Sequence, residues 1–309
     1  MDASKPLELV YSNVDGLELT LDVFVPESAT ELAKAPVFIW WHGGGLLQGT
    51  RKGTAPHHTL APARHGLCIV SADYRLAPQT RLPGILADCK AAMDFVRSAA
   101  FARATGNRVD ASKMVLSGSS AGGWLALLAG TGIGYAACGL ELPSPVSGIA
   151  ALYPISDLSD PFWTTKQHPV SYMPRVVPDD EVAPFLDPAA DKVAFSASDS
   201  KRAVFYHYMV QEGILESLLL DGTGIPKSAF GVAPSLKTGR FAVPPTYVIH
   251  GTIDDKVPCR QARDVVEALR ELKADVEYDE LPGVDHLFDR DPECDMKNMY
   301  AFVARVTGS

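Results

Sequence analysis

The segment Gly118-Ser119-Ser120-Ala121-Gly122-Gly123 contains residue types that can present a reactive hydroxyl group. It follows a short apolar run and opens a stretch of small residues, so it predicts a sharp turn from a strand into a helix. Such a turn strains its central residue and leaves no room for bulk two residues before and two residues after it. Ser120 meets this requirement with Gly118 and Gly122, so we interpret Ser120 as a nucleophile. For this segment alone, the alternative is a glycine-rich turn with incidental serines.

A second glycine-rich segment, His42-Gly43-Gly44-Gly45, directly follows an apolar run. Consecutive glycines allow backbone amides to crowd a reacting carbonyl oxygen. The amides of Gly43, Gly44 and Ala121 are therefore predicted to form an oxyanion hole. A flexible glycine loop is the alternative for this segment alone, but it becomes less favourable beside a nucleophilic turn.

A serine hydroxyl needs a base, and the base needs an acid to orient it. Asp254 and His286 lie in segments that follow the last two predicted strands. The chain order Ser120, Asp254, His286 is the order expected of a catalytic triad on an α/β sheet. The interval of 32 residues between the acid and the base (286 − 254) accommodates one helix and one strand. Rival acids lie nearby, namely Asp255, which is the main one, and Asp285 and Asp289.

The other histidines do not indicate a metal site. His42 belongs to the glycine loop and His250 ends a strand, where a structural role is favoured. The remaining ones have no partners at metal-ligand spacing: His57, His58, His65, His168 and His207. We therefore predict neither a metal nor another cofactor.

These segments need a scaffold that brings them together, and the apolar pattern predicts one. Short unbroken apolar runs are typical of strands covered on both faces, and they occur at 37–41, 67–70, 114–116, 146–153 and 246–249. Helix-like segments alternate with them, for example at 84–100. This alternation predicts an α/β fold with a mostly parallel, doubly wound twisted sheet and helices on both faces.

The two ends of the chain extend this sheet. Alternating apolar and polar residues at 7–12 and 17–25, around Asp15-Gly16, predict an antiparallel hairpin at a sheet edge. The C-terminal part predicts a helix at 257–273, a strand at 276–281 and a closing helix at 293–306.

Residues 156–240 interrupt the alternation. They are rich in proline and aromatic residues and contain one strong helical stretch at 201–220, which predicts an inserted helical lid over a core of residues 1–155 and 241–309. Trp163 and Tyr172 are candidates for its pocket wall. Packing on the core is favoured for most of the other large apolar side chains, namely Phe205, Tyr206, Tyr208 and Met209.

Composition limits the partners. The 309 residues are 47% hydrophobic and 21% charged, which excludes wholesale disorder, and the net charge of −9 without basic runs disfavours nucleic acid. No stretch resembles a signal peptide or a membrane span. Five cysteines without a CxxC pair fit reduced thiols and a cytoplasmic location. A small-molecule substrate is the expected partner, and a sheet edge or the last helix could support a homodimer.

Taken together, the glycine loop, the segment Asp73-Tyr74-Arg75-Leu76-Ala77-Pro78, the serine turn and the late Asp254 and His286 resemble the hormone-sensitive-lipase-like carboxylesterase family of the α/β-hydrolase fold. The resemblance extends from about residue 35 to the C-terminus, except within 156–240. It implies attack by Ser120 on an ester carbonyl, with His286 as base and then acid and Asp254 holding the imidazole. In this family the segment 73–78 supports the sheet and its loops.

The chain departs from the family pattern at three places. Ser119 stands where the family commonly has aspartate. Residues 7–25 have the pattern of sheet, so we expect sheet in place of the usual long N-terminal cap. The loop around Asp254 is more similar to that of prolyl-oligopeptidase-type peptidases and broad esterases. No cluster of lysine and arginine marks an anion clamp, so a neutral, moderately apolar ester of small to medium size is expected. A dedicated lactone or secondary-metabolite hydrolase, or a peptidase or amidase, uses the same triad and stays open. A noncatalytic ligand-binding protein is disfavoured because no triad member is missing.

Overall fold

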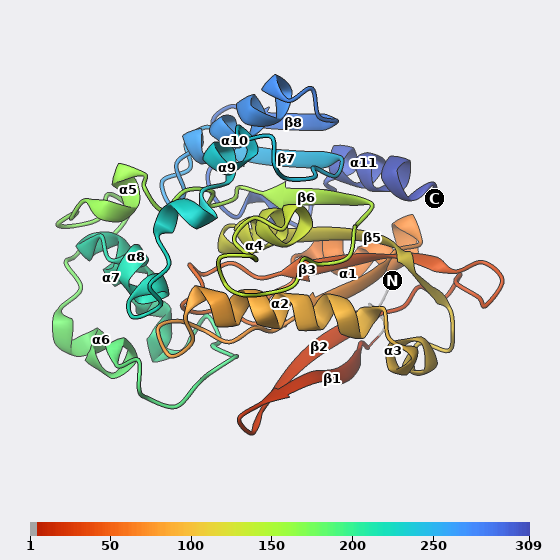
Figure 1. Cartoon of the computed structure of the whole chain (residues 1–309), viewed down its shortest axis with the longest axis horizontal. Coiled ribbons are helices and arrows are strands. Elements are labelled where there is room, and N and C mark those ends of the chain that lie inside the picture. Colours follow the sequence, from red (N-terminus) through yellow and green to blue (C-terminus); the bar gives the residue numbers. More distant parts are fainter. Residues whose placement is uncertain (1–4) are drawn as a thin grey trace.

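The computed structural model describes residues 5–309 (Figure 1). The first four residues, which belong to the predicted core range 1–155, lie outside the described residues. Eight strands form one sheet in the order β1-β2-β4-β3-β5-β6-β7-β8. Their bounds are β1 Leu7–Val14, β2 Leu17–Phe24, β3 Ala35–Trp41, β4 Cys68–Ala72, β5 Val109–Ser119, β6 Gly148–Leu152, β7 Thr246–Gly251 and β8 Val276–Leu281.

The sheet is mostly parallel, as predicted. β2 pairs antiparallel with β1 and with β4, whereas the pairs from β4 through β3, β5, β6 and β7 to β8 are all parallel. The predicted N-terminal hairpin is confirmed and lies at the sheet edge. Because parallel strands end at the same edge of a sheet, the segments that follow β3, β5, β6, β7 and β8 all begin on one side of the molecule.

Side chains alternate between two apolar layers. In β3, Val37, Ile39 and Trp41 join one buried cluster, and Phe38 and Trp40 join another on the opposite face. Helices α2 (Leu82–Val96), α4 (Ala121–Thr131) and α10 (Arg260–Glu271) cover the first face, and α1 (Pro56–His65) and α11 (Lys297–Thr307) cover the second (Figure 1). The predicted fold with helices on both faces is thereby confirmed. The short helix α3 (Ala99–Ala104) follows α2.

Residues 156–240 form short helices at one end of the sheet (Figure 1). Their bounds are α5 Pro161–Thr164, α6 Asp179–Leu186, η1 Lys201–Val204, α7 Phe205–Glu212, α8 Leu215–Leu220, η2 Lys227–Phe230 and α9 Val232–Leu236. Apolar side chains of this segment share one buried cluster with the sheet. The assignment of this segment as an inserted lid domain stays a prediction.

The prediction of one continuous helix at 201–220 is wrong, because this stretch is divided into shorter helices. The chain forms a 3-10 turn, then α7, and then α8 after a break at Gly213, whose φ is +66°. A Cβ at Gly213 would lie 2.9 Å from the carbonyl carbon of Thr164, so the neighbouring backbone also requires glycine there.

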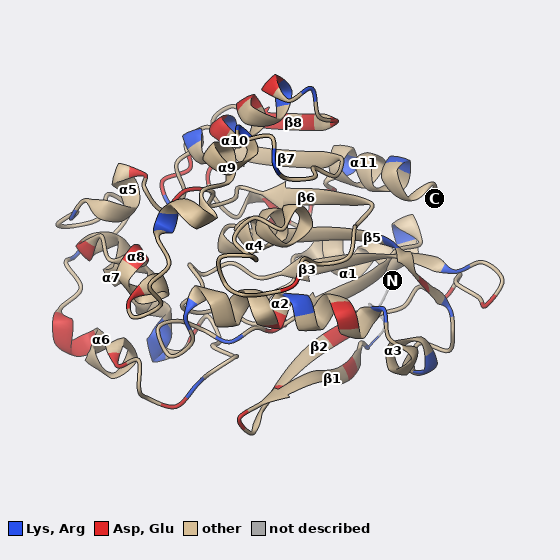
Figure 2. Ribbon diagram, in the orientation of Figure 1, with Lys and Arg blue, Asp and Glu red and all other residues tan. Residues whose placement is uncertain are grey.

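Charge is dispersed over the fold. Figure 2 shows acidic and basic residues of both signs on the outer helices, the edge strands and the loops, whereas the central strands β3, β6 and β7 and helix α4 carry none. Helix α6 begins with three consecutive acidic residues, Asp179, Asp180 and Glu181. Within residues 5–309, no helix combines the length and the apolar character that a membrane crossing requires.

Candidate active site

Ser120 occupies the sharp turn between β5 and α4. Its backbone has φ +59° and ψ −120°, a conformation that costs free energy for a residue with a side chain. A Cβ at Gly118 would lie 2.2 Å from the carbonyl carbon of Gly122, and one at Gly122 would lie 2.0 Å from the main-chain oxygen of Trp41. Any larger residue at position 118 or 122 would overlap main-chain atoms, so the turn requires glycine at both positions. Ser119 lies in β5 instead, where its hydroxyl accepts a hydrogen bond of 3.0 Å from Trp40 Nε1.

The glycine loop lies directly against this turn. A Cβ at Gly43 would lie 3.0 Å from Ser120 Cβ, so the loop can approach the serine only with glycine at this position. The amides of Gly43, Gly44 and Ala121 donate no hydrogen bond to any group within residues 5–309. Three backbone donors beside one serine hydroxyl are the groups that an oxyanion requires.

The buried side chain of His42 supports the loop from behind. Its Nδ1 lies 2.8 Å from the Gly43 carbonyl oxygen, and its ring stacks on Tyr74 at a centroid distance of 4.2 Å. The Tyr74 hydroxyl donates to the His42 carbonyl oxygen at 2.8 Å. Burial lowers the pKa of His42 to about 4, because no carboxylate compensates the charged form. His42 is therefore neutral at pH 7 and positions the loop.

Asp254 and His286 form a direct pair. His286 Nδ1 lies 2.6 Å from Asp254 Oδ2, and the amides of Lys256 and Val257 each donate to Oδ1 at 2.9 Å. His250 Nε2 lies 3.1 Å from Oδ2 and 2.9 Å from the Val257 carbonyl oxygen. Burial alone raises the pKa of Asp254, but the hydrogen bonds from His250, His286 and the Val257 amide outweigh it and hold that pKa well below its usual range.

The rival acids have other partners. Asp255 binds Lys256, and Asp285 accepts the His286 backbone amide at 2.7 Å rather than a ring nitrogen. Asp289 accepts from the Tyr153 hydroxyl at 2.5 Å. Among residues 5–309, the carboxylate that binds the His286 ring is that of Asp254.

Tyr153 connects the imidazole to the serine turn. Its ring lies 4.4 Å from the His286 ring, between centroids, and its backbone has a φ of +37°. The preceding residue, Leu152, accepts the Ser120 amide at 2.8 Å. Ser120 and His286 therefore lie on either side of the same strand end, although the Ser120 hydroxyl makes no hydrogen bond to His286 among the described residues. Such hydrogen bonds are often long before substrate binds.

Aromatic side chains of the 156–240 segment cover the acid loop. The Tyr206 hydroxyl donates to the Lys256 carbonyl oxygen at 2.7 Å, and a Cβ at Gly45 would lie 2.8 Å from the Tyr206 ring. The Lys256 ammonium lies 4.7 Å from the centroid of the Tyr172 ring. Trp163 is fully buried in the apolar cluster. The assignment of Tyr172 and Trp163 to a substrate pocket stays a prediction.

Sequence reasoning did not identify Tyr153 or Lys256, and it interpreted Tyr206 as a packing residue. The only local signal for Tyr153 is its position directly after β6, at the same sheet edge as the serine turn. Within residues 5–309, no group of three or more histidine, cysteine, aspartate or glutamate side chains is arranged to hold a metal ion.

Comparison with known proteins agrees with this geometry. The model of the BD-FAE family, which is a hormone-sensitive-lipase-like α/β-hydrolase family, matches residues 21–170. An α/β-hydrolase superfamily protein from Enterococcus faecalis superposes with a TM-score of 0.69 at 18% identity, covering 100% of both chains. Esterase 2 from Thermogutta terrifontis superposes with a TM-score of 0.67 at 20% identity, covering 99% of this chain and 94% of the esterase. The resemblance predicted from the motifs is confirmed.

A longer protein aligns with nearly the whole chain. The non-reducing polyketide synthase mapC' from Penicillium brevicompactum is 28% identical over 334 aligned positions, which include 94% of this chain. This chain spans only 15% of the synthase.

Proposed function

We propose that this chain, which has the α/β-hydrolase fold, is a serine carboxylesterase that hydrolyses neutral, moderately apolar esters of small to medium size. The observation that carries the proposal is the 2.6 Å contact between His286 Nδ1 and Asp254 Oδ2, beside a strained serine turn with three unused amides. A carboxylate, an imidazole and a hydroxyl in this order are the groups that nucleophilic acyl transfer needs.

In the proposed first step, Ser120 Oγ attacks the ester carbonyl carbon and His286 Nε2 takes the hydroxyl proton. The carbonyl oxygen becomes an oxyanion, which accepts hydrogen bonds from the amides of Gly43, Gly44 and Ala121. The carbon–oxygen bond to the alcohol then breaks, and His286 returns the proton to the leaving oxygen. The products of this step are the alcohol and an acyl ester of Ser120.

In the second step, water repeats the attack. His286 takes a proton from the water, the oxygen adds to the acyl carbon, and the bond to Ser120 breaks as the serine oxygen recovers a proton. The carboxylic acid leaves and the enzyme is restored. Asp254 keeps the Nδ1 proton of the imidazole in place and stabilises the imidazolium in both steps.

Hydrolysis of p-nitrophenyl esters of short acids tests the proposal. We expect wild-type protein to release nitrophenol, and Ser120→Ala protein to lose activity by a factor of at least about 10³. Ser119→Ala is the matched control, because Ser119 binds Trp40 and does not occupy the turn. A fluorophosphonate should label wild-type protein and not the Ser120→Ala variant. Undiminished hydrolysis by pure Ser120→Ala protein would overturn the proposal.

A second candidate is a hydrolase dedicated to esters, thioesters or lactones of secondary metabolites. It is favoured by the alignment of 94% of this chain with part of a polyketide synthase. Comparing kcat/KM for simple nitrophenyl esters with that for aryl thioesters and lactones separates the two candidates. A preference of at least about a hundredfold for simple esters would exclude the second candidate. Peptides and amides in the same panel test the remaining alternative for the same triad.

A further inference from the structure

Arg202 is a buried cation without a carboxylate partner. Three arginines are at least nine-tenths buried in the structure, namely Arg51, Arg75 and Arg202. Arg51 binds the carboxylate of Asp73, and Arg75 binds that of Asp88. No carboxylate within residues 5–309 lies within 4.0 Å of the Arg202 guanidinium. Burying a charge without a counter-ion is costly, so this departure requires an explanation.

The guanidinium of Arg202 is only partly used by neutral acceptors. Nε donates to the Leu47 carbonyl oxygen at 2.6 Å, and Nη2 donates to the Ala77 carbonyl oxygen at 2.6 Å and to Gln79 Oε1 at 2.8 Å. Nη1 donates to no group within residues 5–309 and is not among the side-chain atoms sealed from solvent. These bonds fix the side chain in place, and the guanidinium carbon lies 5.6 Å from the ring centroids of Phe185 and Phe205. The carbonyl, amide and aromatic groups around it supply no negative charge to balance the cation. Burial lowers the pKa of Arg202 to about 10, so it remains a cation at pH 7.

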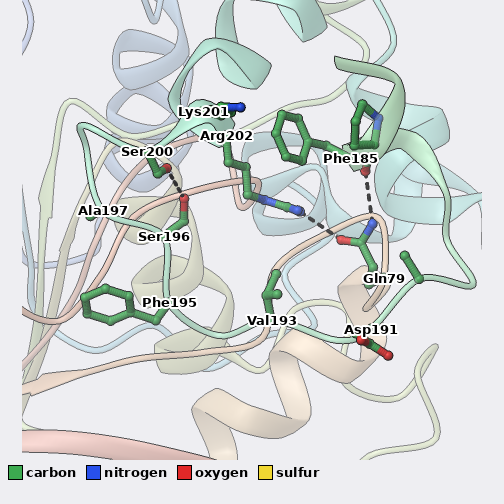
Figure 3. Close-up of a pocket in the computed structure, with 12 residues that line it drawn as sticks. Gln79, Phe185, Asp191, Val193, Phe195, Ser196, Ala197, Ser200, Lys201 and Arg202 are labelled. Atoms are coloured by element: carbon green, nitrogen blue, oxygen red, sulfur yellow. Dashed lines mark hydrogen bonds between the residues drawn. The ribbon is translucent and has the colours of Figure 1, made fainter. Parts of the chain in front are cut away.

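Arg202 lines a cavity of about 590 Å³ that is open to solvent (Figure 3). The 156–240 segment forms its wall, except for Gln79 from the loop after β4. Its apolar wall includes Phe185, Val193 and Phe195, and Phe195 is 50% exposed. Lys201 also lines the cavity and forms no ion pair within residues 5–309. The polar remainder of the lining includes the hydroxyls of Ser196 and Ser200.

We propose that this cavity is a second small-molecule site, which binds the carboxylate of an apolar monocarboxylic acid. The carboxylate would bind Nη1 of Arg202, the ammonium group of Lys201 would add positive charge to the lining, and the hydrocarbon part would cover the exposed ring of Phe195. The volume is within the range of small-molecule sites. Asp191 lies at the end of the cavity away from Lys201 (Figure 3), so the acid must bind with its carboxylate at the lysine end.

The cavity is distinct from the proposed ester site but is joined to its glycine loop. Its lining includes none of the triad residues. Arg202 binds the Leu47 carbonyl oxygen, and Ser196 and Gly49 exchange backbone hydrogen bonds of 2.9 and 3.1 Å. Both Leu47 and Gly49 belong to the chain that continues the glycine loop. An acid in the cavity would therefore hold this part of the loop against the 156–240 segment.

The test titrates 3-phenylpropionate into wild-type protein at low ionic strength, with 3-phenylpropanol as the neutral comparison. We expect the acid to bind with a Kd of about 1 mM or lower and the alcohol to bind at least about tenfold more weakly. Lys201→Glu and Ala197→Trp should each weaken binding of the acid at least about tenfold, because one reverses a charge and the other fills the cavity. Lys34→Glu makes the same charge change at an exposed site away from the cavity and should leave the Kd unchanged.

The variants avoid Arg202 itself, whose replacement would also remove three hydrogen bonds of the fold. Matching far-ultraviolet circular dichroism spectra of the variants establish that each is folded. The absence of saturable binding in wild-type protein overturns the inference. Binding that Lys201→Glu and Ala197→Trp leave unchanged also overturns it, because the acid then binds elsewhere. The readout is binding of an acid and not hydrolysis of an ester, so this inference and the proposed esterase activity can fail separately.

Discussion

Replacing Asp254 with asparagine removes a charge while almost preserving the shape of the site. The asparagine carbonyl oxygen can still accept the amides of Lys256 and Val257, which bind Asp254 Oδ1 at 2.9 Å. Its amide nitrogen then takes the place of Oδ2, 2.6 Å from His286 Nδ1. A donor would face a donor. The imidazole must therefore move its proton to Nε2, where it prevents His286 from accepting the serine proton.

The size of the effect follows from this tautomer change. A wrongly protonated base in a serine triad reduces kcat by a factor of about 10⁴. At about 1.36 kcal/mol for each factor of ten, this is about 5 kcal/mol of lost transition-state stabilisation. We expect kcat/KM for p-nitrophenyl butanoate to fall by about this factor in Asp254→Asn protein. Circular dichroism at the assay temperature shows whether the variant is folded.

Asp255→Asn is the matched control. Asp255 is the next residue in the same loop, but it binds Lys256 and does not contact the imidazole. We expect this variant to keep kcat/KM within about twofold of wild type, as is usual for a surface change away from the reacting groups. A loss smaller than tenfold in Asp254→Asn, or an equal loss in both variants, would refute the reasoning.

Three further predictions concern the framework of the site. In Gly122→Ala the new methyl group would lie 2.0 Å from a main-chain oxygen, so the free energy of unfolding measured in urea should fall by about 3 kcal/mol. Gly231→Ala, whose Cβ would meet no atom closer than 3.5 Å, should change it by less than about 0.5 kcal/mol. Tyr153→Phe removes the 2.5 Å hydrogen bond to the Asp289 carboxylate and should cost about 2 kcal/mol of stability in the same assay, while kcat/KM changes little because the ring stays in place. His42 has a folded-state pKa of about 4 against an unfolded value of about 6.5, so the unfolded chain gains its proton first and stability falls as the pH drops from 6.5 to 4. At about 1.36 kcal/mol per pH unit, the loss in the free energy of unfolding reaches about 3 kcal/mol. Unfolding midpoints measured across this pH range should therefore vary less with pH in His42→Asn protein than in wild-type protein.

The elements that carry the proposed triad could be predicted because their sequence signals are local. An unbroken apolar run such as 37–41 is compatible with a strand covered on both faces, and the structure places its residues alternately in two buried clusters. The serine turn is equally local, because Gly118 and Gly122 are required by contacts within one strand–turn–helix unit. Short-range sterics of this kind can be interpreted from residue types alone.

The 156–240 segment could not be predicted with the same detail. Residues 201–220 have the apolar spacing of one helix, yet the chain breaks at Gly213 to approach the backbone of Thr164, which is far away in sequence. Helix α1 was expected only as one of the helix-like segments between strands, and its bounds could not be predicted for a related reason. Its ten residues include two prolines and three histidines, and tertiary packing of His57 and His58 stabilises it rather than intrinsic propensity.

Charge pairing is the property that residue patterns predict least. Arg51 and Arg202 each stand next to a lysine in the sequence. Arg51 is nevertheless buried against the carboxylates of Asp22 and Asp73, whereas Arg202 is buried against carbonyl oxygens and two aromatic rings. The type of partner that a buried cation contacts, a carboxylate or a carbonyl oxygen, depends on chain segments that lie 22 to 155 residues away. Counting lysines and arginines therefore does not exclude an anion site apart from the ester site, because one buried cation without a carboxylate partner is enough to make one. Arg202 is such a cation, and a search for anion sites in this fold should begin from unpaired buried charges rather than from clusters of basic residues.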